Sequence, residues 1–185
     1  AMNDIKTARR HLTSAKQEVQ DDIERAVGFR IESDILRKEN NLRGSISALE
    51  SAVKLDTNQP TYWNTLAARR LLLINDSTFL PSEKQSLLNQ AEKESLNAIS
   101  LNDYARPHQN LSLIYLELGM LDRAKEQAIL SYEMAEKQIK KSLANEIICK
   151  GCRAYGKDGL IIKTQCQECL RKASDTIRDI ELLGG

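Results

Sequence analysis

The sequence has little of what marks many other protein classes. Among its 185 residues, 4% are aromatic, three are proline and two are histidine. No apolar run approaches the ~18 residues of a membrane-spanning helix, and the polar start, AMNDIKTARRHL, lacks the apolar centre of a secretory signal. Basic and acidic side chains nearly balance, 27 against 26, so no net field attracts nucleic acid or an anionic membrane. We expect a cytoplasmic protein that binds no membrane, although a trimmed leader would leave the same start.

Signatures of catalysis are also missing. His11 and His108 lie far apart in sequence, and there is no phosphate-binding loop, no G-x-S-x-G and no H-E-x-x-H. His108 falls at a helix-packing position, where we expect a core side chain. The sequence therefore predicts a protein that is not an enzyme.

One stretch, Leu111 to Ala124 (LSLIYLELGMLDRA), organises the chain. Its apolar residues follow helical spacing up to Leu118, Gly119 interrupts the run, and the spacing resumes at Leu121. This predicts two helices joined by a tight turn. The order of Leu, Ser, Tyr, Leu-Gly and Ala resembles the tetratricopeptide repeat (TPR), a helical hairpin of about 34 residues. The resemblance implies an all-α, TPR-like helical solenoid that binds another protein.

Three repeats of this kind fit the chain. The first, at 26–59, has Ser33 and Ser45 where its two helices would touch, and Asn40-Asn41 at its turn. Pro60 opens the second, and the third, at 105–138, matches the family pattern best. An amphipathic helix over residues 3 to about 25 precedes the repeats, and we expect it to pack on the first repeat or to mediate self-association. The helix at the end of the third repeat continues to about Ile148 and would cap the solenoid.

The second repeat carries an enlargement. It is about 11 residues longer than the usual repeat, and the extra residues lie between its two helices, in the segment that contains Phe79 and Leu80. Ser82 and Gln85 have the form of a capping box, so a second helix should start near Pro81 or Ser82. We expect the enlarged loop to plug the core locally.

All the cysteines lie near the end of the chain. Cys149, Cys152, Cys166 and Cys169 form two C-x-x-C pairs separated by 13 residues. Four thiolates in short pairs suit one tetrahedral, structural Zn²⁺ ion, which leaves no open position for catalysis. Two disulfides in an oxidising compartment, or an iron or redox site, are the alternatives.

The residues around the cysteines suggest a small module. Asp158-Gly159 is a turn signal, and the run Leu160-Ile161-Ile162 is apolar and rich in β-branched residues, which predicts a β-hairpin between the two pairs. A helix would follow, with Cys166 and Cys169 in its first turn. This order resembles a treble-clef zinc finger, with a zinc ribbon as the near alternative. We therefore expect two domains, a helical solenoid at 1–148 and a zinc module with a C-terminal helix at 149–185.

The TPR resemblance also implies a binding site. In that family the first helix of each repeat lines a concave groove. The residues that would line it and contact a peptide or protein partner here are Arg30, Asp34, Arg37, Asn64, Arg106 and Gln109, with Ala68, Leu71 and Leu113 beside them. Arginine side chains suit an extended peptide or an acidic tail, because they pair with carboxylates. The identity of the partner and the choice between monomer and dimer stay open.

Two other functions are compatible with the sequence. Six basic residues outnumber two acidic ones over 149–172, for a charge of +4 that a four-thiolate zinc site reduces to about +2. Nucleic-acid binding through the zinc module is therefore an alternative, although this charge disfavours it. The chain could also be a docking segment of a larger, multidomain regulator.

Overall fold

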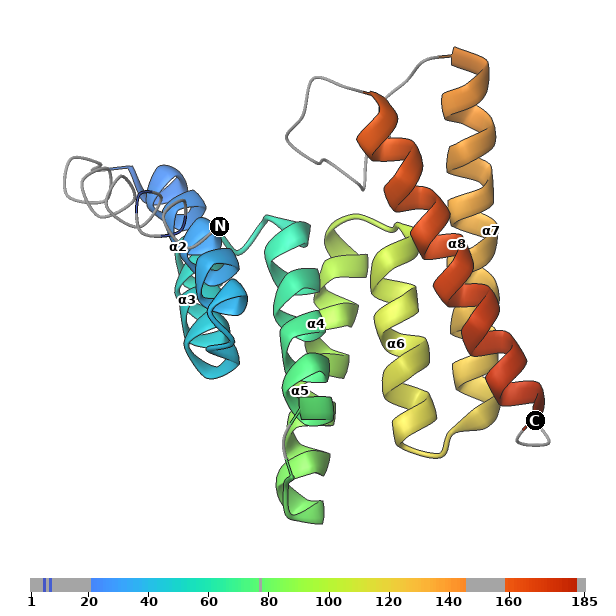
Figure 1. Cartoon of the computed structure of the whole chain (residues 1–185), viewed down its shortest axis with the longest axis horizontal. Coiled ribbons are helices and arrows are strands. Elements are labelled where there is room, and N and C mark those ends of the chain that lie inside the picture. The colour runs from blue at the N-terminus through green and yellow to red at the C-terminus, as the bar shows by residue number, and fades with distance from the viewer. Residues whose placement is uncertain (1–4, 6, 8–20, 77, 146–158, 183–185) are drawn as a thin grey trace.

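The computed structural model describes residues 5, 7, 21–76, 78–145 and 159–182 (Figure 1). Within these residues every regular element is a helix, and none of these helices has the length and apolar character that spanning a membrane requires. The helices follow one another as antiparallel pairs, which confirms the all-α architecture. Their bounds are α2 (Asp22–Lys38), α3 (Leu42–Leu55), α4 (Pro60–Asp76), α5 (Pro81–Leu101), α6 (Ala105–Glu117), α7 (Leu121–Asn145) and α8 (Gly159–Leu182).

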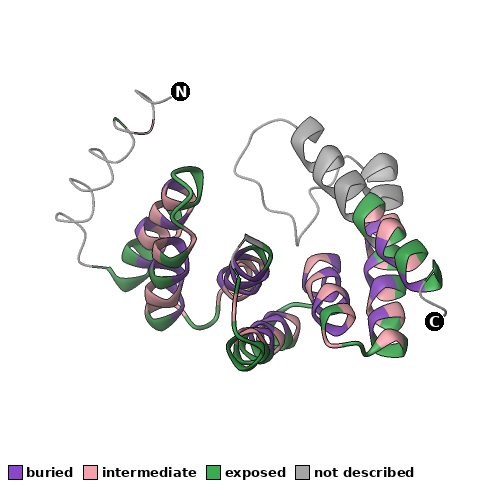
Figure 2. Cartoon of the chain, turned by 60° about the horizontal axis from the view of Figure 1, so that its bottom comes forward, coloured by how far each residue is buried: buried purple, intermediate pink, exposed green. Residues whose placement is uncertain are grey.

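Three helical hairpins make up the stack. Helices α2 and α3, α4 and α5, and α6 and α7 pack in pairs, and α3 contacts α4 while α5 contacts α6. Helix α4 also contacts α6, so the first helices of the second and third hairpins are neighbours. Figure 2 shows the hairpins side by side with their buried residues turned toward one another. This is the arrangement that the three predicted repeats require.

The first and third hairpins turn in the same way. Asn40 and Gly119 each lie two residues past the end of a first helix, and both have positive φ angles, 60° and 72°. The next residue donates its backbone N–H to a carbonyl in the last turn of that helix, from Asn41 to Leu36 and from Met120 to Tyr115. Glycine and asparagine are the residues that tolerate this left-handed conformation. The two turns are therefore structurally equivalent.

The start of the first hairpin differs from the prediction. A helix was expected to run to about residue 25, but Asp21 has extended backbone angles and caps a new helix, accepting the N–H of Ile23 at 2.7 Å. An aspartate at this position stabilises the otherwise unpaired N–H groups of the first turn. Helix α2 consequently begins at Asp22, four residues before the predicted repeat.

The second hairpin is the enlarged one. Helix α5 begins at Pro81 as expected, but its capping residue is Leu80 instead of the predicted Ser82, and Glu83 accepts the N–H of Leu80 at 3.1 Å. Phe79 packs against the core of the first and second hairpins, and the guanidinium of Arg43 lies 5.7 Å from its ring centre. The loop therefore acts as the local plug that the sequence predicted, through Phe79.

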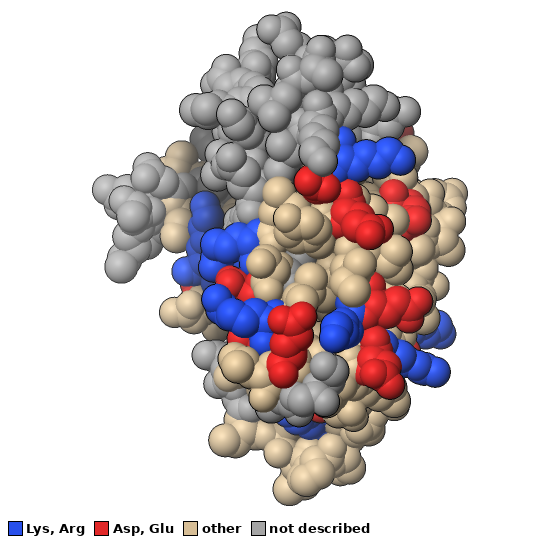
Figure 3. Space-filling view, turned by 90° about the vertical axis from the view of Figure 1, so that its right-hand side faces the viewer, with Lys and Arg blue, Asp and Glu red and all other residues tan. Residues whose placement is uncertain are grey.

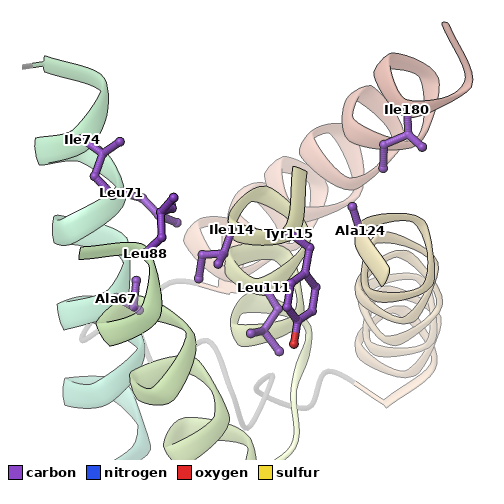
Figure 4. Packing of buried hydrophobic residues seen from close by; sticks show 10 residues of the cluster. Ala67, Leu71, Ile74, Leu88, Leu111, Ile114, Tyr115, Ala124 and Ile180 are labelled. Atoms are coloured by element: carbon purple, nitrogen blue, oxygen red, sulfur yellow. The ribbon is translucent and has the colours of Figure 1, made fainter. Parts of the chain in front are cut away.

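Small residues allow the two helices of the first hairpin to approach closely. Ser33 and Ser45 are fully buried, and their hydroxyl oxygens lie 2.7 Å apart. Two aliphatic cores lie on either side of α4, and the larger one extends to the end of the chain. Its members are Ala67, Leu71, Ile74, Leu88, Ala91, Leu111, Ile114, Tyr115, Ala124 and Ile180 (Figure 4).

The C-terminal helix covers the third hairpin. Helix α8 packs on α7 and α6, crosses α7 obliquely in Figure 1, and brings Ile180 into the larger core. Its length overturns one prediction: Leu160-Ile161-Ile162 lies in α8 and forms no strand of a β-hairpin. Because α8 packs on α7, tertiary packing decides the structure here, and β propensity is known to yield to such context. The predicted domain boundary at residue 148 lies outside the described residues.

Candidate functional site

One face of the stack is formed by the first helices of the three hairpins. On α4, exposed or half-buried residues recur at steps of four, three and four, and the positions between them are buried except for Trp63, which is half-buried. Exposed or half-buried residues with the same spacing lie on α2 and α6. Their positions correspond when the two helices are aligned by the turns at Asn40 and Gly119. We call this surface the first-helix face. It comprises Val27, Ile31, Asp34 and Lys38 of α2, Thr61, Thr65, Ala68 and Leu72 of α4, and Arg106, Asn110, Leu113 and Glu117 of α6.

Apolar side chains occupy much of this face. Ile31 and Leu72 are 46% and 43% exposed, which is high for aliphatic residues. Val27, Ala68 and Leu113 are half-buried. Exposed apolar side chains lose contact with water when a partner covers them, which favours binding. The face therefore offers aliphatic contacts as well as charge.

Only some of the residues that were predicted to line the groove lie on this face. Asp34 and Arg106 lie on it, together with Ala68 and Leu113. Asn64 and Gln109, which were expected to contact the partner, are buried, as is Leu71. Each lies one residue away from an exposed or half-buried position, and one residue is a rotation of about 100° around a helix.

The sequence-based prediction missed Thr65, Leu72 and Asn110. Leu72 lies within a run of three leucines, so apolar character alone could not show which of the three faces solvent. The amide of Asn110 donates to the backbone oxygen of Asn64 at 3.1 Å and to its side-chain oxygen at 3.0 Å. Asn64 is therefore part of the contact between α4 and α6 and does not face solvent.

Arginines gather where α2 meets α4. Arg30 forms an ion pair with Asp34 one turn further along α2, and Arg69 of α4 donates from Nη2 to the same carboxylate at 2.8 Å. Arg69 Nε also donates to the hydroxyl of Ser45 at 3.3 Å, so two nitrogens of its guanidinium group have hydrogen-bond partners. We call Arg30, Arg37 and Arg69 the arginine cluster.

The electrostatics show how close these cations are. Burial, together with repulsion from Arg37 and Arg30, lowers the pKa of Arg69 to about 10, although attraction to Asp34 opposes this. Arg69 is still protonated at neutral pH, so two guanidinium groups, those of Arg30 and Arg69, contact the carboxylate of Asp34. An arrangement of this kind attracts anions.

A second ionic network lies inside the stack. Arg70 donates from Nη2 to Glu50 of α3 at 2.7 Å and from Nε to Glu94 of α5 at 2.8 Å. It therefore joins the first hairpin to the second. His108 is also an interior residue: it is buried, with its ring nitrogens 2.7 Å from Gln127 Oε1 and 2.7 Å from Asp103 Oδ1. The expectation that His108 is a core side chain is confirmed.

The predicted metal ligands fall mostly outside the structural description. Cys149 and Cys152 lie outside the described residues, and the backbone of Cys166 and Cys169 lies in α8. These two were expected in the first helical turn, but α8 begins at Gly159, so they lie about two turns further along. Within the described part of the chain, no group of three or more His, Cys, Asp or Glu side chains is placed to hold a metal.

Charge on the outer side of the third hairpin is mixed. Figure 3 shows basic and acidic side chains interspersed among uncharged ones on the face that carries α7 and α8. Within α8, Asp175 pairs with both Arg171 and Arg178. The coloured residues of this view give no continuous basic surface of the kind that binds nucleic acid.

The fold defines a class of protein: stacked antiparallel hairpins with small residues at the helix contacts make a TPR-like helical-repeat fold. The sequence matches no protein-family model and no curated protein. Solved structures show the likeness. A crystal structure of MamA has a TM-score of 0.59 and 17% identity, covering 96% of this chain and 91% of that chain. A crystal structure described as MamA protein has a TM-score of 0.59 and 18% identity, covering 95% of this chain and 84% of that chain.

A third structure names the fold directly. TTC0263, a thermophilic TPR protein in Thermus thermophilus, has a TM-score of 0.58 and 18% identity, covering 90% of this chain and 88% of that chain. At this level of identity the likeness concerns the fold alone. The TPR-like part of the sequence-based prediction is confirmed.

Proposed function

We propose that this chain is a non-catalytic scaffold for protein–protein interaction, which binds a segment of its partner on the first-helix face. The observation that carries this proposal is the recurrence of solvent-facing positions on the first helices of all three hairpins, of which α4 contacts α6 and is joined to α2 by the Arg69–Asp34 ion pair. A partner lying across the helices would contact all three hairpins at once. Scaffolds built from stacked repeats use such extended surfaces for binding.

The chemistry of this face suits binding better than reaction. It combines aliphatic side chains with charged and polar ones, and several of its polar groups, those of Asp34, Asn110 and Glu117, already form contacts within the fold. Glu117, for example, pairs with Lys84 at 2.6 Å. Polar groups fixed in this way act as a preformed surface and cost little ordering entropy when a partner binds.

Affinity capture from a lysate of the source organism tests the proposal. The full chain serves as bait, and Leu72→Asp places a charge on the first-helix face. Leu96→Asp is the matched control, because Leu96 of α5 is about as exposed, at 47% against 43%, and belongs to a second helix. Bound proteins are quantified by mass spectrometry, and circular dichroism checks that both variants melt like the wild type.

We expect at least one captured protein to be lost with Leu72→Asp and kept with Leu96→Asp. If the wild type and both variants capture the same proteins in the same amounts, the first-helix face is not the docking surface.

We further propose one structural Zn²⁺ ion bound by Cys149, Cys152, Cys166 and Cys169. Cys166 and Cys169 form a C-x-x-C pair, as Cys149 and Cys152 do, and two such pairs are the usual ligand set of a structural four-cysteine zinc site. The zinc would stabilise the segment that carries the four cysteines, residues 149–169.

Elemental analysis of reduced, metal-replete protein tests the zinc site. We expect about one zinc per chain. Cys166→Ser should lose the metal and Gln167→Ser, its neighbour in α8, should keep it. Protein with four titratable thiols and no zinc would contradict the site, and protein without free thiols would favour disulfides.

A further inference from the structure

We infer that the joint between the first and second hairpins is a pH-sensitive hinge, which opens more readily once the Glu94 carboxyl is ionised. The joint is the contact of α3 with α4, and an ionic network reaches across it. Opening would move the first hairpin, with its share of the first-helix face, away from the rest of the stack. The pH would thus set how often the three hairpins present a continuous first-helix face.

One arginine connects three helices at this joint. Arg70 of α4 donates to Glu50 of α3, in the first hairpin, at 2.7 Å, and to Glu94 of α5, in its own hairpin, at 2.8 Å. Arg70 and Glu94 are buried, whereas the side chain of Glu50 is 42% exposed. Two carboxylates, one from each hairpin, therefore share a single guanidinium group.

The charges of this network balance when Glu94 is neutral. One arginine then faces one carboxylate, that of Glu50, whereas ionisation of Glu94 leaves a net negative charge in the joint. Glu94 Oε2 is buried and has no hydrogen-bond partner among the residues that the structure describes. A buried ionised carboxylate with one oxygen unpaired costs more free energy than a neutral carboxyl group in the same place. Opening of the joint lowers this cost, because water then reaches the carboxylate.

Glu94 changes its charge near neutral pH. Burial raises its pKa from 4.5 to about 7 against the attraction of Arg70, and repulsion from Glu50 acts in the same direction as burial. An open joint returns the carboxyl to water and to its ordinary pKa. The closed joint is therefore favoured most below pH 4.5 and loses this advantage as the pH rises to about 7.

The other ionisable groups around Glu94 keep their charge in this range. Arg69, which links α4 to Asp34 of α2 and to Ser45 of α3, has a pKa of about 10 and stays protonated. Helix α6 also packs on α5, and its Tyr115 donates to Glu92, on another side of α5. Burial raises the pKa of Tyr115 above its ordinary value, so this side chain stays neutral.

Hydrogen exchange of the full chain, followed by mass spectrometry from pH 6 to pH 8, tests the hinge. Each exchange rate is divided by the intrinsic rate at the same pH, which gives an opening constant for α3. The constant for global unfolding comes from urea denaturation. We expect α3 to open more often than the whole molecule unfolds, and its opening constant to rise about tenfold from pH 6 to pH 8.

Three variants separate the network from other causes. Glu94→Gln has no charge to lose, so its opening constant should change less than about twofold over this range. Glu133→Gln, an exposed carboxylate of α7, is the matched control and should keep the tenfold rise. Glu50→Gln removes the acceptor of Arg70 in the first hairpin and should raise the opening constant at pH 6 by about two- to fivefold. Circular dichroism checks that each variant is folded.

Several outcomes would overturn the hinge. If α3 exchanges only through global unfolding, the joint does not open by itself. A local opening constant that is the same at pH 6 and pH 8, or a tenfold rise that persists in Glu94→Gln, would exclude Glu94 as the cause. An unchanged opening constant in Glu50→Gln would show that Arg70 does not hold the joint closed. None of these outcomes bears on partner docking, which Leu72→Asp tests separately.

Discussion

Arg70 and Glu94 form a buried ion pair between the two helices of the second hairpin, with Arg70 Nε 2.8 Å from Glu94 Oε1. The other carboxylate oxygen, Oε2, is buried without a hydrogen-bond partner within the described residues. Burial raises the pKa of Glu94 from 4.5 to about 7, although attraction to Arg70 opposes this. The folded protein therefore holds a proton on Glu94 more tightly than the unfolded chain does.

This difference makes stability depend on pH. Between pH 4.5 and about 7 the folded state binds the proton and the unfolded state has lost it, so the free energy of unfolding falls as the pH rises. The full loss, of order 3 kcal/mol, is reached above the folded-state pKa. We expect Glu94→Gln to remove most of this decline, measured by urea denaturation from pH 4.5 to 8. Glu133→Gln, an exposed carboxylate of α7, serves as the control and should follow the wild type.

The equivalent turns at Asn40 and Gly119 can be compared by substitution. No atom lies within 4 Å of the position that a Cβ of residue 119 would take, so only the positive φ resists a side chain. We expect Gly119→Ala to lower the free energy of unfolding by about 1 kcal/mol. Gly119→Asn should cost less, because asparagine adopts this conformation at the first turn. Equal losses in denaturation experiments would contradict the equivalence.

Ile180 tests whether α8 belongs to the core of the third hairpin. Its side chain is fully buried in the cluster that includes Leu111 and Ala124. We expect Ile180→Ala to cost about 2–5 kcal/mol in thermal or chemical unfolding, because it leaves a cavity. Leu182→Ala, two residues further and 79% exposed, should change stability by less than ~0.5 kcal/mol. Similar effects of the two substitutions would show that α8 is not packed as described.

The plug in the second hairpin gives a matched pair of neighbours. Phe79 packs on the core and under Arg43, whereas Leu80 is 66% exposed. Truncation of Phe79 to alanine should destabilise the protein by about 1–3 kcal/mol. Truncation of Leu80 to alanine should have little effect on the melting temperature. A larger loss of stability from Leu80 than from Phe79 would contradict the assignment of the plug to Phe79.

Much of this fold follows from local sequence. Three local signals locate the hairpins without tertiary information. They are the small residues Ser33 and Ser45, the turn residues Asn40 and Gly119, and the proline at the start of each helix of the second hairpin. These signals work because each corresponds to a local steric or hydrogen-bonding requirement.

The remaining differences depend on tertiary packing. Leu160-Ile161-Ile162 has β propensity but belongs to a helix that packs on α7. The choice among Leu71, Leu72 and Leu73 depends on which sides of α4 are covered by α3, α5 and α6. The sequence therefore predicted which helices form the first-helix face, but an error of one residue along a helix exchanged buried and exposed side chains.

The position of α8 has a consequence for larger assemblies. A repeat stack grows when another hairpin settles on the outer side of its last one, and here that place is taken by the protein's own helix. Copies of the molecule cannot continue the superhelix end to end in this direction without displacing Ile180 from its core. Any polymer that the protein forms must be joined through other surfaces.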